Sequence, residues 1–187
     1  MKSILLFLPI FFIGASATAQ GVFSNQTNFI LEKVVQDYSG QFKNIRGEMI
    51  SSGQGVSAYK STLVIPGAVS TTITETNGAQ KQVCWQSVLY ANTAFATAKE
   101  RFETLFNQIK NTIIKPEGEK PVIVNGLFMN PSADKVYNTI QFDLLPPAGL
   151  MQKVNIDLVM QHTGSQWQIL LSVYDMQRKE NGEMVVK

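Results

Sequence analysis

The sequence predicts an α+β protein in which a helix followed by three strands occurs twice. Three observations support this fold class. Two stretches carry apolar residues at helical spacing, several β-branched runs end at Pro/Gly or Asn-Gly turns, and short motifs of the first half return in the second. We therefore expect tandem αβββ repeats, a mostly antiparallel sheet of six or more strands, and two long helices packed on one face.

The first repeat, residues 25–90, is expected to open with a helix from Asn28 to Arg46. Its apolar residues recur every three or four positions and share one face: Ile30, Val34, Tyr38, Phe42 and Ile45. Ser39-Gly40 is a weak point in the middle of this helix, because glycine costs roughly 1 kcal/mol relative to alanine there. The Gly/Ser-rich stretch from Ser51 to Gly55 is predicted to be a loop.

Three strands are predicted after that loop. Tyr59 to Ile65 ends at the turn pair Pro66-Gly67, and Ser70 to Thr76 ends at Asn77-Gly78, a strong hairpin signal. Gln82 to Tyr90 is the third strand. Its alternation places Val83, Trp85, Ser87 and Leu89 on one face and Cys84, Gln86, Val88 and Tyr90 on the other.

The second repeat, residues 91–175, begins with the clearest helical pattern in the chain, from Thr93 to Ile114. Its apolar stripe comprises Phe95, Ala98, Phe102, Leu105, Phe106, Ile109 and Ile113. A loop-rich insertion follows from Lys115 to Pro131, with a short apolar piece from Val122 to Val124 that could add a strand. Later strands are expected at 136–145, 152–161 and 167–174, and the second of them ends at Thr163-Gly164.

Three pairs of short matches relate the two halves. Residues 41–46 (QFKNIR) resemble residues 105–110 (LFNQIK), Leu63 to Pro66 resembles Asp143 to Pro146, and Trp85-Gln86 resembles Trp167-Gln168. The offset grows along the chain, and the insertion after the second helix accounts for the increase. Two copies sharing one core fit this pattern, whereas an α+β domain without duplication is the alternative.

The N-terminal end of the chain predicts export. Lys2, the apolar stretch from Ile4 to Ile13 and the small residues Ala17-Thr18-Ala19 form the pattern of a secretory signal peptide, residues 1–19. We expect one α+β domain over 20–175, a loose tail over 176–187, and a soluble protein in the periplasm or outside the cell. No cysteine lies at the expected cleavage point, so a lipoprotein is not expected.

Charge and cysteine content exclude several kinds of partner. Without Lys2, the 16 basic residues become 15 against 14 acidic ones, so the net charge is near zero. We find no basic cluster that would neutralise phosphates, and we expect no nucleic-acid partner and no stable membrane insertion. Cys84 is the single cysteine, so the chain cannot form an internal disulfide.

Several of these motifs resemble a family of small exported bacterial proteins that has no assigned activity. The resemblance rests on Phe42, Ile45-Arg46-Gly47, the stretch from Tyr59 to Ala68, and Phe102, Leu105 and Ile109. It covers about residues 29–114, and it implies a fold but no catalytic residue. The tandem arrangement of a helix and strands is also similar to the architecture of secreted β-lactamase-inhibitory proteins.

The sequence offers little catalytic or metal-binding chemistry. Nucleophilic catalysis would need Cys84 or a serine near a base, and His162 is the single histidine. A Cys84–His162 pair is the candidate for a hydrolase, although a buried Cys84 and a solvated His162 are favoured. Glu117 and Glu119 could be the paired carboxylates of glycoside chemistry, but their Pro/Gly/Lys loop favours a solvated position for both. We predict no cofactor and no metal site.

We therefore expect a non-enzymatic binding or interaction module for an unidentified protein or a small apolar ligand. A carrier of a small apolar ligand is the alternative, with a cavity between helices and sheet that is lined by Tyr38, Phe42, Phe95, Phe102 and Phe106. A second set of aromatic residues, Trp85, Tyr90, Trp167 and Tyr174, lies on the last strand of each half. Burial of both tryptophans in the core is favoured over a binding surface. The ligand-binding residues and the oligomeric state are not predicted.

Overall fold

A computed structural model describes residues 20–76, 81–147 and 149–175. The expected signal peptide, the Asn77-Gly78 turn and the C-terminal tail lie outside these residues. The helical elements are α1 (Gln20–Asp37), α2 (Phe95–Ile109) and the 3₁₀ helices η1 (Tyr38–Gly40) and η2 (Gly149–Lys153). The strands are β1 (Arg46–Gly53), β2 (Val56–Ser61), β3 (Ser70–Thr76), β4 (Val83–Asn92), β5 (Ile113–Ile114), β6 (Val122–Gly126), β7 (Tyr137–Leu145), β8 (Val154–Thr163) and β9 (Gln166–Asp175).

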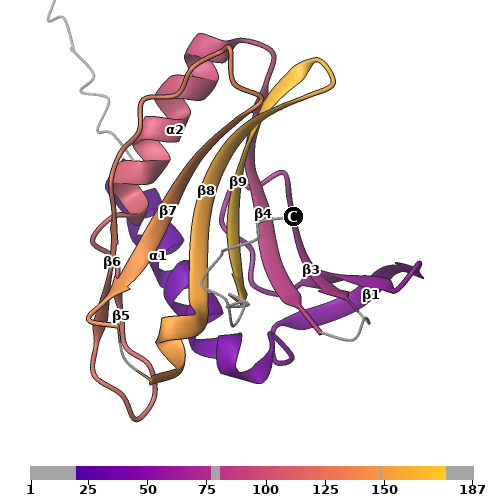
Figure 1. The fold of residues 1–187 in the computed structure, drawn as a ribbon, viewed down its shortest axis with the longest axis vertical. Coiled ribbons are helices and arrows are strands. Elements are labelled where there is room, and N and C mark those ends of the chain that lie inside the picture. Colours follow the sequence, from indigo (N-terminus) through magenta and orange to yellow (C-terminus); the bar gives the residue numbers. More distant parts are fainter. Residues whose placement is uncertain (1–19, 77–80, 148, 176–187) are drawn as a thin grey trace, which may run out of the picture.

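All nine strands in the described part of the chain form one antiparallel sheet. Its order is β1-β2-β3-β4-β9-β8-β7-β6-β5, so the last strand of each half, β4 and β9, meet at the middle. The expected α+β class with a mostly antiparallel sheet is confirmed. In Figure 1, β1 to β3 extend away from α2, which runs beside β7.

Helix α2 packs on the central strands β4, β8 and β9. Its buried side is the predicted stripe without its two ends: Ala98, Phe102, Leu105, Phe106 and Ile109. The Phe106 ring stacks on Phe142 of β7 at 5.8 Å, and Phe95 contacts Trp167 of β9 at 5.0 Å. The face that carries Phe142 and Trp167 is therefore the core face of the sheet. Helix α1 contacts α2 and β5.

The predicted helix from Asn28 to Arg46 is wrong at both ends. The structure begins α1 at Gln20 and ends it at Asp37, and Arg46 opens strand β1. Gln41 and Phe42 have φ angles of 57° and 56°, in the left-handed region that stops an α-helix. Phe42 is nevertheless fully buried. Its position in the core explains why an apolar period continues past the true helix end.

The predicted loop from Ser51 to Gly55 is largely a hairpin. Strand β1 runs to Gly53, and Gln54-Gly55 form the turn into β2, both with positive φ as a two-residue hairpin turn requires. The last six residues of β1 are exposed, so no alternation of polar and apolar residues marks the strand. Each half thus has more than the three strands predicted, namely four (β1–β4) and five (β5–β9).

The remaining boundaries differ by smaller amounts. Strand β3 matches its prediction, whereas β2 ends at Ser61 and not at Ile65. The Ser61 hydroxyl donates to the Leu63 carbonyl at 2.8 Å and turns the chain there. Helix α2 ends at Ile109 and not at Ile114, because Asn111 has a φ of 70° and Thr112 donates to the Ile109 carbonyl at 2.7 Å.

Candidate functional site

The sheet has a second face, opposite the one that α2 covers, and we call it the outer face. Strand β7 shows it most clearly, because buried and exposed residues alternate along its whole length. Its exposed side chains are Tyr137, Thr139, Gln141, Asp143 and Leu145. All five point away from Phe142, so they belong to the outer face.

A groove of about 620 Å³ lies over β6 and β7. Its polar lining comes from Thr139, Gln141 and Asp143 of β7, from Asn125 of β6 and from Lys110 just after α2. Its apolar lining comes from Ile140 of β7, which is buried, and from the segment after β6, where Leu127 is 81% exposed and Met129 is 56% exposed. Such exposure of large apolar side chains beside a polar floor is typical of an interaction site rather than of a core.

Gly126 allows this segment to leave the sheet. A Cβ at this position would lie 2.7 Å from Cδ1 of Phe142, a ring that is held in the core by its stack on Phe106. The backbone therefore passes closer to Phe142 than any other residue type would permit. Leu127, the next residue, lines the groove.

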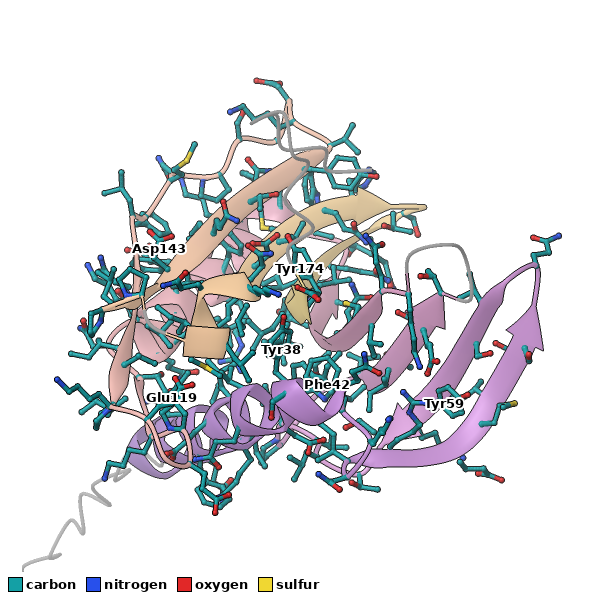
Figure 2. The ribbon with its side chains drawn as sticks, turned by 60° about the horizontal axis from the view of Figure 1, so that its bottom comes forward. Tyr38, Phe42, Tyr59, Glu119, Asp143 and Tyr174 are labelled. Atoms are coloured by element: carbon teal, nitrogen blue, oxygen red, sulfur yellow. The ribbon has the colours of Figure 1, made fainter. Side chains whose placement is uncertain are left out.

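Two hydrogen-bonded polar pairs, which we call the outer-face network, continue from the groove across the middle of the outer face. Gln141 donates to Asn155 at 3.1 Å, and its register partner on β8 is Asp157. Asp157 accepts a 2.7 Å hydrogen bond from the Tyr174 hydroxyl, and its Oδ1 atom is buried without a hydrogen-bond partner. Asp143 and Tyr174 are both labelled in Figure 2, well away from Tyr59 on the β2 side of the molecule.

The electrostatics of this network do not favour nucleophilic chemistry. Burial, reinforced by the nearby Asp157 carboxylate, raises the pKa of Cys84 to about 12, so the side chain stays a thiol. Burial also raises the pKa of Asp157, although the Tyr174 hydrogen bond opposes that shift. The pKa of Tyr174 is raised by burial and by its hydrogen bond to Asp157. A thiol that stays protonated in this way is a poor nucleophile.

Apolar side chains lie at both ends of the outer side of β7. At one end, Ile113, Ile123 and Leu145 are register partners across β5, β6 and β7, and they are 53%, 45% and 42% exposed. At the other end, Tyr137 is 63% exposed. Half of the 14 large apolar residues that are exposed in the described part of the chain fall between 113 and 145, which makes this region the foremost candidate interaction surface.

The structure does not bring Cys84 and His162 together. Cys84 is the register partner of Tyr174, whereas His162 is the register partner of Trp167. These two positions are seven residues apart along β9, about 23 Å at roughly 3.3 Å per residue. The His162 ring instead lies 4.8 Å from the Trp167 ring. A Cys84–His162 dyad is therefore not formed.

The two tryptophans lie in the core, as the sequence favoured. Trp85 is fully buried and donates from its indole nitrogen to the Ser61 hydroxyl at 3.0 Å, and Trp167 is 7% exposed. Tyr90 is partly buried against the core. Tyr174 differs from these three, because its hydroxyl takes part in the outer-face network.

The aromatic residues assigned to a carrier cavity contact other rings. Tyr38 contacts Phe42 at 6.2 Å, and Phe102 and Phe106 contact Phe128 at 6.5 and 5.2 Å. These ring contacts lie in the region in which the carrier hypothesis places its ligand. Figure 2 shows Tyr38 and Phe42 near the end of α1.

A second, smaller surface pocket of about 220 Å³ includes Glu117 and Glu119. Gln36, Ser39 and Leu150 also line it. Across the residues that the structure describes, no three His, Cys, Asp or Glu side chains are grouped so as to hold a metal ion. Among the helices in that same part of the chain, none has the length and apolar character to cross a membrane.

Comparison of the chain with protein-family models, with curated proteins and with solved structures finds no match.

The groove was not predicted from the sequence. The polar side chains of β7 were visible as an alternating strand, but Leu127 and Met129 lie in a loop of no regular pattern. No signal in the sequence places that loop against the outer face of a strand that begins ten residues later.

Proposed function

We propose that the chain is an exported, non-enzymatic interaction module that binds another protein through its outer face along β6 and β7. The observation that carries the proposal is the groove with its exposed Leu127 and Met129 above a polar floor. Buried apolar anchors surrounded by polar contacts supply most of the energy in protein interfaces. The charge content of the chain and the signal-peptide pattern of residues 1–19 are consistent with this proposal.

A small apolar ligand in the core is the weaker alternative. The rings of Phe102, Phe106 and Phe128 contact one another there. The groove on the outer face, by contrast, is open to solvent and combines amide, hydroxyl and charged side chains with apolar ones. A mixed lining of this kind suits a polypeptide better than an apolar small molecule.

Native mass spectrometry of residues 20–187, purified gently from the producing cells, tests the proposal. We expect a stoichiometric protein partner with the wild type. The Leu127→Ser variant should retain that partner about 10- to 100-fold less well, as for loss of an interface anchor. Val69→Ser is the matched control, because Val69 is 64% exposed but lies outside the groove. A bare monomer, or equal loss in both variants, would contradict the proposal.

We also infer that the two halves arose by duplication and that both helices lie on one face. Each half contains a helix followed by an antiparallel meander, and the Pro66-Gly67 turn follows β2 as Pro146-Pro147 follows β7. The test is superposition of β1–β4 on β6–β9 in an experimental structure. The inference requires the two helices to coincide after that superposition. A helix that falls on the opposite face would refute it.

A further inference from the structure

The outer side chains of β7 form a linear strip that is longer than the groove. They run from Tyr137 to Leu145 in alternate positions, eight residues apart at the ends. At roughly 3.3 Å per residue the strip is about 26 Å long. Its two ends are apolar and its middle, Thr139, Gln141 and Asp143, is polar. A compact small molecule would cover only the middle of this strip.

The charge of the groove selects against a polyanion and against a strongly charged partner. Lys110 and Asp143 line the same groove, so its two formal charges cancel. The rest of the polar floor is neutral, from Asn125, Thr139 and Gln141. A side-chain amide both donates and accepts hydrogen bonds, as the peptide group does. The polar but uncharged peptide backbone of a partner therefore complements the middle of the strip.

The apolar ends complement side chains rather than backbone. Ile113 and Ile123 extend the apolar end at Leu145 across two further strands. At the other end, Tyr137 is the apolar residue of the strip, while Leu127 and Met129 form an apolar wall of the groove. Methionine adapts to differently shaped apolar groups, so this wall is suited to more than one side chain.

We propose that the partner is an extended polypeptide segment of about eight residues that lies along β7, with an apolar side chain at each end and uncharged polar residues between them. This inference rests on the proposed function and specifies the partner of the same site. A folded partner surface, a second copy of this chain and a small molecule are the competing occupants. None of these three occupants needs the length of about 26 Å, estimated above from strand geometry, or the two apolar ends that the strip has.

A fluorescent peptide library tests the proposal with residues 20–187. In the library, two leucines are fixed roughly eight positions apart, as the strip requires, and mixtures of Ser, Thr, Gln, Asn and Gly separate them. The control library has the same composition with the two leucines adjacent. Anisotropy measures affinity, and amide chemical shifts locate the binding. We expect the spaced library to bind at least about tenfold more tightly, a difference of one hot-spot contact.

Variants of exposed residues then place the binding on the strip. Leu127→Ser and Leu145→Ser should each weaken the spaced library about tenfold, whereas Val69→Ser should not change it. Circular dichroism and the thermal midpoint verify that each variant is folded. The inference is overturned if both libraries bind equally, if the amide chemical-shift changes fall outside β6 and β7, or if neither library binds. If a native partner is still captured in that case, the proposed function stands and the partner binds by a folded surface. Concentration-dependent dimerisation that the spaced library does not displace also overturns the inference, because a second copy then occupies the face.

Discussion

The hydrogen bond between Trp85 and Ser61 allows the sharpest stability prediction. The indole nitrogen of Trp85 donates to the Ser61 hydroxyl at 3.0 Å, and both residues are buried. Ser61→Ala removes the acceptor and leaves a buried N–H without a partner. It also removes the bond from Ser61 to the Leu63 carbonyl. An unsatisfied buried donor costs about 1–3 kcal/mol, so we expect a loss of about 2 kcal/mol in the free energy of unfolding.

Urea unfolding followed by far-UV circular dichroism measures this loss. The midpoint should fall while the m-value stays constant, and the melting temperature should fall by about 4–8 °C for a chain of this size. Ser70→Ala is the control, because Ser70 is exposed and should change stability by less than about 0.5 kcal/mol. In a Trp85→Phe background no indole donor remains, so Ser61→Ala should cost less there. An equal cost in both backgrounds would refute the assignment of the effect to this hydrogen bond.

Three further predictions concern the outer face. The raised pKa of Asp157 means that this carboxyl stays protonated to higher pH in the folded protein than in the unfolded chain. The free energy of unfolding should therefore fall as the pH rises from the ordinary aspartate pKa through the raised pKa of Asp157. Asp157→Asn should therefore be more stable than wild type at neutral pH and lose that advantage in acid, and parallel pH dependences would contradict this. Gly126→Ala should lower the free energy of unfolding in urea by about 1–3 kcal/mol, because the new Cβ would clash with Phe142. Gly53→Ala is the control, because the space around its Cβ position is open. Equal losses in the two variants would exclude the clash as the cause. Cys84 should react with iodoacetamide at pH 8 far more slowly in the folded protein than in urea, because its pKa of about 12 keeps it a thiol, and equal rates would show that the thiol is not held this way.

Elements with a strong period could be predicted from the sequence. The stripe of α2 is amphipathic along its whole length, and the β-branched run of β3 is bounded by turn residues at both ends. In both cases local preference and burial favour the same structure. The burial of Trp85 and Trp167 also followed from residue type alone.

The errors arose where tertiary contacts override the local pattern. Phe42 continues the apolar period of α1, yet it reaches the core from a left-handed backbone conformation. Strand β1 is exposed over most of its length, so its pairing with β2 leaves no alternation to recognise. The groove depends on register between strands and on the path of a loop at Leu127, and neither is encoded as a local period.

Site-specific photo-crosslinking tests the central claim, that the outer face binds a protein. A p-benzoylphenylalanine residue replaces Thr139 on the groove floor in one variant and Val69 in the matched control, and both variants are irradiated in the producing cells. We expect the Thr139 variant to form a covalent adduct with one protein, and mass spectrometry should place the adduct within an extended segment of that protein. The Val69 variant should form none. Adducts from Val69 alone, the same adducts from both positions, or none from Thr139 would contradict the account.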